Sequence, residues 1–122
     1  MIQKESKLVV ADNTGAKSLL VFGILGGSKR RYARAGDIVI ASVTEADPTA
    51  NVKKKSIVKA LIIRTRCGEN RKDGTRVEFE DNAAIIVNDK KEPIGKRVFG
   101  PVSRSVSRKN FGRVYSLATE VI

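Results

Sequence analysis

The 122-residue chain contains no histidine, no tryptophan and one cysteine, Cys67. Without histidine it cannot form a His-based catalytic triad, a His-ligated metal site or an imidazole acid–base catalyst. One cysteine excludes an intramolecular disulfide and a multi-cysteine zinc site, and it suits a reducing compartment. We therefore expect no metal, no cofactor and no enzymatic activity.

Long apolar runs are also missing. The longest mostly apolar stretch covers residues 19–27, which is about half the length of a membrane-spanning helix. The first six residues contain no basic segment followed by an apolar one, so no signal peptide is predicted. No GxxxxGK[ST] pattern occurs, which excludes a Walker-type nucleotide-binding loop. These absences predict a soluble cytoplasmic protein.

Positive charge dominates what is present. The formal net charge is +11, which implies a polyanionic partner such as nucleic acid or an acidic membrane surface. Residues 29–34, 53–76 and 94–113, here called the first, second and third basic windows, together carry a net +17, whereas the rest of the chain carries −6. A single lysine-rich window is as typical of a solvated surface as of a binding site. Three windows that almost lack acids favour nucleic acid.

Short runs rich in Val and Ile, separated by turn residues, predict six strands. They cover residues 7–11, 18–25, 38–44, 56–65, 76–79 and 83–87. The apolar run 60–63 does not alternate with polar residues, so we expect its strand to be covered on both faces. Strands of this length and spacing favour a small antiparallel β-barrel or sandwich, and we expect a closed or nearly closed barrel.

The residues after Pro101 have a helical pattern instead. Ser103 can cap a helix, and Arg104 and Arg108 would share one face four residues apart. We predict a short basic helix over 103–110 and a second apolar turn or helix over 114–118. The chain is expected to be one domain, with a barrel and hairpin excursions in residues 1–100 and a short helical appendix in residues 101–122.

The first basic window follows two glycines that allow a tight chain reversal. We expect its cations to project at a hairpin tip beside one aromatic ring, which suits phosphate contact and base stacking. An ordinary solvated hairpin is the alternative. The residues assigned to RNA binding in this window are Lys29, Arg30, Arg31, Tyr32 and Arg34.

The second basic window contains a lysine run, in which each residue acts as a point charge, and an arginine-rich strand end. Arg64 and Arg66 alternate there, which predicts that they share one face and that Cys67 is a semi-buried apolar residue on the other. Further cations surround a predicted hairpin turn at residues 73–74. The residues assigned to RNA binding in this window are Lys53, Lys54, Lys55, Arg64, Arg66, Arg71 and Lys72.

Other readings of these residues are less favoured. The acids at 78, 80 and 81 are interpreted as outward strand positions that balance neighbouring cations, rather than as a catalytic carboxylate pair. An enzyme would need a nucleophile–base pair, which the sequence lacks. A barrel that binds single strands would gather its aromatic rings, whereas the six here are scattered. Charge in three separated segments suits folded RNA better than a DNA groove.

Several motifs occur in a fixed order along the chain: VADNTGA at 10–16, GGSKRRYA at 26–33, ALIIRTR at 60–66, PIGKRVFGP at 93–101 and SLATEVI at 116–122. Together with residues 1–3 and 73–82 they resemble the large-subunit ribosomal protein L14 family in its bacterial or organellar form. The resemblance is collinear over all 122 residues. It implies a small five-stranded antiparallel β-barrel with a projecting basic hairpin and a C-terminal region of short helices.

The resemblance also implies a function and partners. Family members are structural constituents of the large ribosomal subunit, in the cytoplasm or in an organelle. They bind large-subunit ribosomal RNA, contribute to intersubunit bridges with small-subunit RNA and adjoin ribosomal proteins L3 and L19. A ribosome silencing factor docks on bacterial members, and its footprint would fall on Lys96, Arg97 and Arg113. The full set expected at protein or bridge contacts is Lys96, Arg97, Arg104, Arg108, Lys109 and Arg113.

Overall fold

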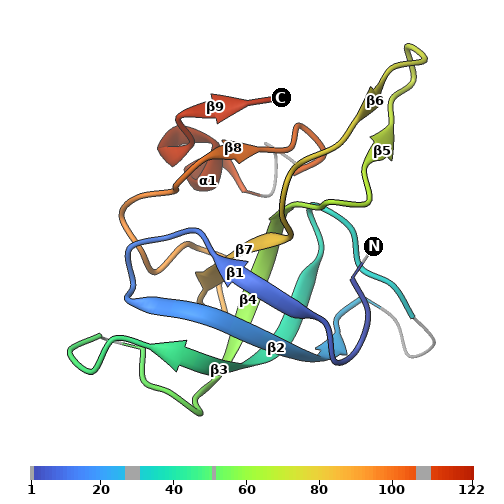
Figure 1. Ribbon diagram of the computed structural model, residues 1–122. Helices are drawn as coiled ribbons and strands as arrows, with labels where there is room; N and C mark the ends of the chain where they lie inside the picture. The colour runs from blue at the N-terminus through green and yellow to red at the C-terminus, as the bar shows by residue number, and fades with distance from the viewer. Residues whose placement is uncertain (1, 27–30, 51, 107–110) are drawn as a thin grey trace.

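The computed structural model describes residues 2–26, 31–50, 52–106 and 111–122 (Figure 1). Within these ranges the elements are β1 (Lys7–Val10), β2 (Ala16–Ile24), β3 (Ile38–Ala46), β4 (Ile57–Arg64), β5 (Glu69–Asn70), β6 (Arg76–Val77), β7 (Ala83–Val87), β8 (Pro101–Val102), α1 (Gly112–Leu117) and β9 (Glu120–Val121). No helix in the described ranges is long and apolar enough to cross a membrane.

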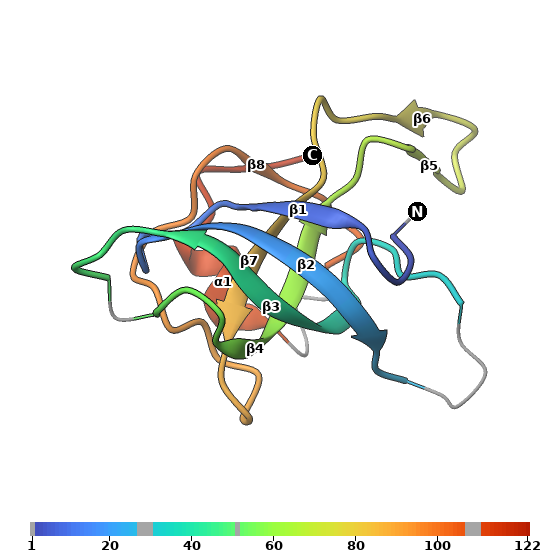
Figure 2. The ribbon, with the colours of Figure 1, turned by 60° about the horizontal axis from the view of Figure 1, so that its bottom comes forward.

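Five strands close into a barrel in the order β1–β2–β3–β4–β7 (Figures 1 and 2). Neighbouring strands are antiparallel except at the seam between β1 and β7, where they are parallel. The prediction of a closed five-stranded barrel is confirmed, but the prediction that it is antiparallel throughout is wrong at this seam. The chain leaves the barrel between β4 and β7, and it returns beside β1 in the same direction as β1.

Alternating side chains fill the barrel. In β1, for example, Leu8 and Val10 are buried while Lys7 and Val9 are exposed. This alternation is typical of a strand with one face on the core and one on solvent.

β4 and β7 differ from the other strands because both of their faces are buried. Ala60 and Ile62 of β4 belong to the core inside the barrel, whereas Leu61 and Ile63 belong to a second apolar core outside it. This confirms the prediction that the run 60–63 is covered on both faces. The second core is completed by residues of the C-terminal segment, namely Val98, Val102, Val106, Phe111 and Val114.

The C-terminal segment contains the parallel pair β8–β9 and the helix α1. The helix predicted over 103–110 is wrong for residues 103–106, which form a turn. Their backbone groups bond across the fold instead: the Ser103 amide donates to the Ile63 carbonyl, and the Arg104 amide donates to the Ile122 carbonyl. Residues 107–110 lie outside the described residues. The observed helix, α1, overlaps the apolar segment predicted at 114–118.

The hairpin that projects from the barrel is β5–β6 (Figure 1). Its turn holds Asp73 and Gly74, as predicted, and the Arg71 amide donates to the Thr75 carbonyl across it. The strand predicted over 76–79 forms part of this hairpin, as β6, and not part of the barrel.

The hairpin predicted in the first basic window has its tip at residues 27–30, outside the described residues. The Leu25 amide donates to the Ile38 carbonyl, and Ala33 pairs with Ile2.

Arg64 ties β4 to two other parts of the chain. Its guanidinium donates to both carboxylate oxygens of Asp81, at 2.6 and 3.2 Å, and to the carbonyl oxygens of Phe99 and Pro101, at 2.9 and 3.0 Å. Gly100 has a positive φ of 79°, and a Cβ there would lie 2.7 Å from Nη1 of Arg64. The arginine thus joins the end of the barrel to the entry of the C-terminal segment.

The prediction that Arg64 and Arg66 share one face is wrong. Arg64 is only 8% exposed, whereas Arg66 is exposed. The pairing of β4 with β7 shifts register between Ile62 and Arg64, and β4 ends at Arg64, so strand alternation does not continue beyond it. For the same reason the prediction that Cys67 is semi-buried is wrong: it is exposed, within the turn at residues 66–67.

We predict that Arg64→Lys lowers the free energy of unfolding by about 2 kcal/mol, because a lysine cannot reproduce the planar fork and would leave buried carbonyl oxygens without donors. Urea unfolding followed by far-ultraviolet circular dichroism measures the change. Arg66→Lys is the matched control, since Arg66 is exposed, and it should change the same quantity by less than about 0.5 kcal/mol. Equal effects of the two substitutions would contradict the structural role of Arg64.

Candidate nucleic-acid interface

Two of the basic windows meet at one end of the barrel. The loop after β2, which carries Arg31, Tyr32 and Arg34, lies on the same side of the molecule as the β5–β6 hairpin with Lys72 (Figures 1 and 2). All four of these side chains are exposed, and so is Arg66 at the base of the hairpin. We call this region the hairpin end. Lys29 and Arg30 lie outside the described residues.

The β5–β6 hairpin is fastened to the C-terminal segment by Glu69. Its two carboxylate oxygens accept hydrogen bonds from the hydroxyls of Ser103 and Ser105, and one of them also pairs with Arg71 at 2.9 Å. Arg71 in turn donates to the carbonyl oxygen of Ile122 at 2.7 Å. The hairpin therefore projects from a fixed base.

These contacts shift the pKa of Glu69. Burial raises the pKa, but the hydrogen bonds from the two serine hydroxyls and the charge of Arg71 outweigh burial, so that the pKa lies below its ordinary value. The pKa of Asp81 is also lowered, chiefly by its hydrogen bond from Arg64, against a smaller raising effect of burial. Both carboxylates are thus held in the charged form by the folded chain.

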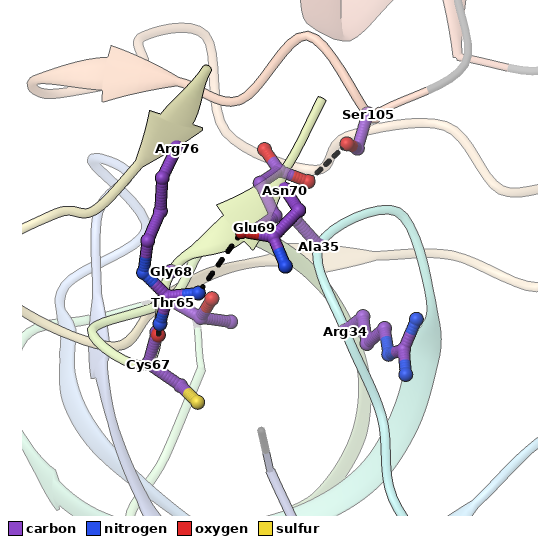
Figure 3. Close-up of a pocket in the computed structure, with 9 residues that line it drawn as sticks. All are labelled: Arg34, Ala35, Thr65, Cys67, Gly68, Glu69, Asn70, Arg76 and Ser105. Atoms are coloured by element: carbon purple, nitrogen blue, oxygen red, sulfur yellow. Dashed lines mark hydrogen bonds between the residues drawn. The ribbon is translucent and has the colours of Figure 1, made fainter. Parts of the chain in front are cut away.

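A polar pocket of about 490 Å³ opens at the hairpin end (Figure 3). In Figure 3, Arg34 and Ala35 lie on one side of it, and Cys67, Gly68 and Arg76 lie on the other. The remaining lining residues are Thr65, Glu69, Asn70 and Ser105. The pocket thus joins the loop before β3, the base of the hairpin and the C-terminal segment.

Three arginines of the second window bond within the protein through their side chains, and so does Lys59, which pairs with Asp89 at 3.1 Å. Arg76 donates to Glu78 at 2.8 Å, to the Asn70 side chain at 3.1 Å and to the Cys67 carbonyl at 2.8 Å. Arg64 and Arg71 are engaged as described above. The sequence pattern predicts Arg64 and Arg71 at the RNA. It does not indicate the distant acceptors of their guanidiniums, which are Asp81, Phe99 and Pro101 for Arg64 and Ile122 for Arg71.

The lysine run lies away from the hairpin end, in the loop between β3 and β4 (Figure 1). Lys53, Lys54 and Lys55 are all exposed. The Ser56 hydroxyl donates to the Lys53 carbonyl at 2.6 Å, and the Lys55 amide donates to the Val43 carbonyl at 2.7 Å. The loop is therefore folded back on β3, and it presents three adjacent positive charges to solvent.

The cations expected at protein or bridge contacts lie in different parts of the structure. The amides of Lys96 and Arg97 donate to the side-chain oxygen of Asn13, which places them beside the β1–β2 turn. Arg113 lies on α1, with its guanidinium 3.9 Å from Glu92. Arg104 is near the C-terminus, where its amide bonds to Ile122. Arg108 and Lys109 lie outside the described residues.

Sequence reasoning missed the pocket and its polar residues Thr65, Asn70 and Ser105. No motif links them, because they come together only when the hairpin base meets the C-terminal segment. The acids were interpreted as balancing nearby cations, and Glu78 does pair with Arg76 and Asp81 with Arg64. Across the described part of the chain, no group of three or more Cys, Asp and Glu side chains is arranged to hold a metal ion.

We predict that stability falls as the pH drops below about 4.5, the ordinary pKa of Glu69. Because the folded-state pKa lies below the unfolded one, the unfolded chain binds more protons in this interval, and the free energy of unfolding decreases until the folded-state pKa is passed. Urea unfolding at a series of pH values between 7 and 3 measures how the free energy of unfolding depends on pH.

The variant Glu69→Gln should be less stable at pH 7 but should lose less stability on acidification, with Asp81 supplying the remaining loss. Glu80→Gln, at an exposed carboxylate of the same segment, is the control and should keep the wild-type acid dependence. If the free energy of unfolding of Glu69→Gln decreased with falling pH as steeply as that of the wild type, the Ser103–Glu69–Ser105 contacts would not hold the carboxylate in its charged form.

The sequence of the chain matches a model of a known protein family. The model described as ribosomal protein L14p/L23e matches residues 1–122, which is the whole chain. The described residues form a closed five-stranded barrel, and the chain belongs to the ribosomal protein L14p/L23e family.

Proposed function

We propose that this protein binds large-subunit ribosomal RNA through the hairpin end and the Lys53–Lys55 loop, without catalysis. Membership of the family implies a structural role in the large subunit of a cytoplasmic or organellar ribosome. The observation that carries the RNA proposal is the separation of the cations into those that bond within the protein and those that face solvent on fixed loops. Only the cations that face solvent are available to contact phosphates of an RNA.

For the described residues, the proposed RNA contacts follow from exposure, whereas Lys29 and Arg30 are proposed from the sequence alone. Arg64 and Arg71 bond to protein groups, so we assign them to the fold. Tyr32, which is 48% exposed, can stack on a base between neighbouring cations. The proposed contact residues are Lys29, Arg30, Arg31, Tyr32, Arg34, Lys53, Lys54, Lys55, Arg66 and Lys72.

The third basic window is proposed to face other components of the ribosome. Lys96 and Arg97 beside the β1–β2 turn, and Arg113 on α1, are exposed on a different part of the molecule from the hairpin end. Small-subunit RNA at intersubunit bridges, ribosomal proteins L3 and L19 and a silencing factor are the partners that we propose for this side. Arg108 and Lys109, which lie outside the described residues, are proposed for the same partners from the sequence alone. Arg104 lies beside Arg71 and Lys72 of the β5–β6 hairpin, so its proposed contact would be made at the hairpin end.

The salt dependence of RNA binding provides one test. If about eight cations contact phosphates, log K should fall with log salt at a slope of about −6 to −7. Replacing Lys53, Lys54 and Lys55 together by Ala should reduce the size of this slope by about two to three, which filter binding to large-subunit ribosomal RNA at several salt concentrations measures.

The matched control replaces Lys4, Lys7 and Lys17 by Ala. These three lysines are also exposed, lie outside the basic windows and remove the same charge. If both triple variants changed the slope equally, net charge and not the position of the lysine loop would explain the binding.

Incorporation into the ribosome provides a second test. We expect the protein to sediment with the large subunit and to remain there at moderate salt. Replacing Lys29, Arg30 and Arg31 together by Ala should lower the bound fraction severalfold, because three phosphate contacts are lost. Unchanged incorporation would contradict the assignment of the first window, and absence of the native protein from large subunits would contradict the proposed function as a whole.

A further inference from the structure

We propose that the pocket at the hairpin end receives one unpaired nucleotide of the large-subunit ribosomal RNA. The inference rests on the proposed function, because it presumes that RNA covers this end of the molecule. It goes further than the proposed function because it assigns recognition of a single nucleotide to uncharged side chains of the pocket. Contacts between charged side chains and phosphates alone would bind RNA without distinguishing its bases.

The pocket has walls that the fold holds in place. Gly36 has a positive φ of 95°, and a Cβ there would lie 2.9 Å from the carbonyl oxygen of Ser105. The loop before β3 therefore lies directly against the C-terminal segment. On the other side, Glu69 fastens the hairpin base to Ser103 and Ser105. A volume of about 490 Å³ falls within the usual range of small-ligand sites.

Two polar groups inside the pocket have capacity left for a ligand. The side-chain oxygen of Asn70 accepts from the Arg76 guanidinium, which can only donate, so the other amide atom of Asn70 is its nitrogen. Figure 3 shows this nitrogen pointing into the open space of the pocket, away from Arg76. Thr65 is 7% exposed and lines the same space, and its hydroxyl can both donate and accept. Together they offer hydrogen bonds to the edge of a base or to a ribose hydroxyl.

The chemistry of the pocket favours a nucleotide over a peptide side chain. Apart from Ala35 and Gly68, every lining residue carries a polar or sulfur-containing side chain, so an apolar anchor of a protein partner would find little to pack against. Arg34 lies at the rim, and the exposed Arg66 directly precedes Cys67. A base extruded into the pocket would leave its phosphates beside these cations, as single-stranded loops of folded RNA do on protein surfaces.

The only cysteine of the chain reports directly on this site, because Cys67 is exposed and lines the pocket. Its alkylation by N-ethylmaleimide is measured by mass spectrometry in the free protein and in the protein assembled into large subunits. We expect the rate to fall about tenfold on assembly, since an occupied pocket hides the thiol from the reagent.

A control cysteine separates occupancy of the pocket from general shielding. In Cys67→Ser with Asp89→Cys, the new thiol takes the place of a side chain that is 93% exposed, in the turn after β7 away from the hairpin end. Its alkylation rate should change little on assembly. Equal alkylation of Cys67 in free and assembled protein would overturn the pocket proposal while leaving RNA binding intact, whereas failure to assemble would overturn the proposed function itself.

The identity of the occupant is tested by cross-linking. Cys67 is modified with azidophenacyl bromide, the protein is assembled into large subunits, and the cross-link is located after irradiation. A cross-link confined to one unpaired nucleotide and its neighbours supports the proposal. A cross-link to a ribosomal protein instead of RNA overturns it.

The two uncharged groups are tested by the double variant Thr65→Val with Asn70→Ala. Its affinity for large-subunit ribosomal RNA should fall about tenfold with an unchanged salt slope, because contacts to one base are lost and no phosphate contact is lost. Ser116→Ala on α1 should leave both quantities unchanged, and circular dichroism shows that each variant is folded. Wild-type affinity in the double variant, or a reduced salt slope, would contradict a role for these groups in holding a nucleotide.

Discussion

The burial of β4 and β7 on both faces is the constraint on which the rest of the structure depends. One face of each strand completes the interior of the barrel, and the other is covered by the C-terminal segment. Neither core can form without these strands, so the barrel and the C-terminal segment are packed as one body. The described parts of the loops that carry basic residues therefore start and end on strands of this one packed body.

The end of β4 is where this body meets the candidate interface. Arg64 is the last residue of the strand, and its guanidinium bonds to Asp81 at the return from the hairpin and to carbonyls at the entry of β8. Beyond Arg64 the chain leaves the barrel as the β5–β6 hairpin, whose base forms one wall of the pocket. The buried arginine thus joins the end of β4 to the return from the hairpin and to the entry of β8, and its planar fork suits several acceptors at once.

Much of the barrel could be predicted because its signals are local. The alternation in β1 and the unbroken apolar run 60–63 each report burial within a few residues. The errors concern contacts between distant segments. Arg64 bonds to residues 17, 35 and 37 positions away, and Ser103 and Ser105 bond to Glu69 at separations of 34 and 36. Those bonds replace the helix predicted at 103–106, and no spacing rule within one segment indicates them.

Contacts between distant segments also affect how the basic charge is interpreted. Some cations that are counted in the sequence bond within the folded protein, so the count alone exceeds the number of cations proposed to meet RNA. Within the described residues, Arg64, Arg71 and Arg76 pair with Asp81, Glu69 and Glu78. Arg64 and Arg71 also bond to carbonyl groups of distant segments, so these two arginines stabilise the fold. Lysines 53–55 have no such role, and they point to solvent from a loop that is folded back on β3. Arginine is used where several acceptors must be bridged, and lysine where a mobile charge is enough. Pairing with acids therefore engages part of the positive charge within the protein, and our RNA-binding proposal draws on exposed cations outside these pairs.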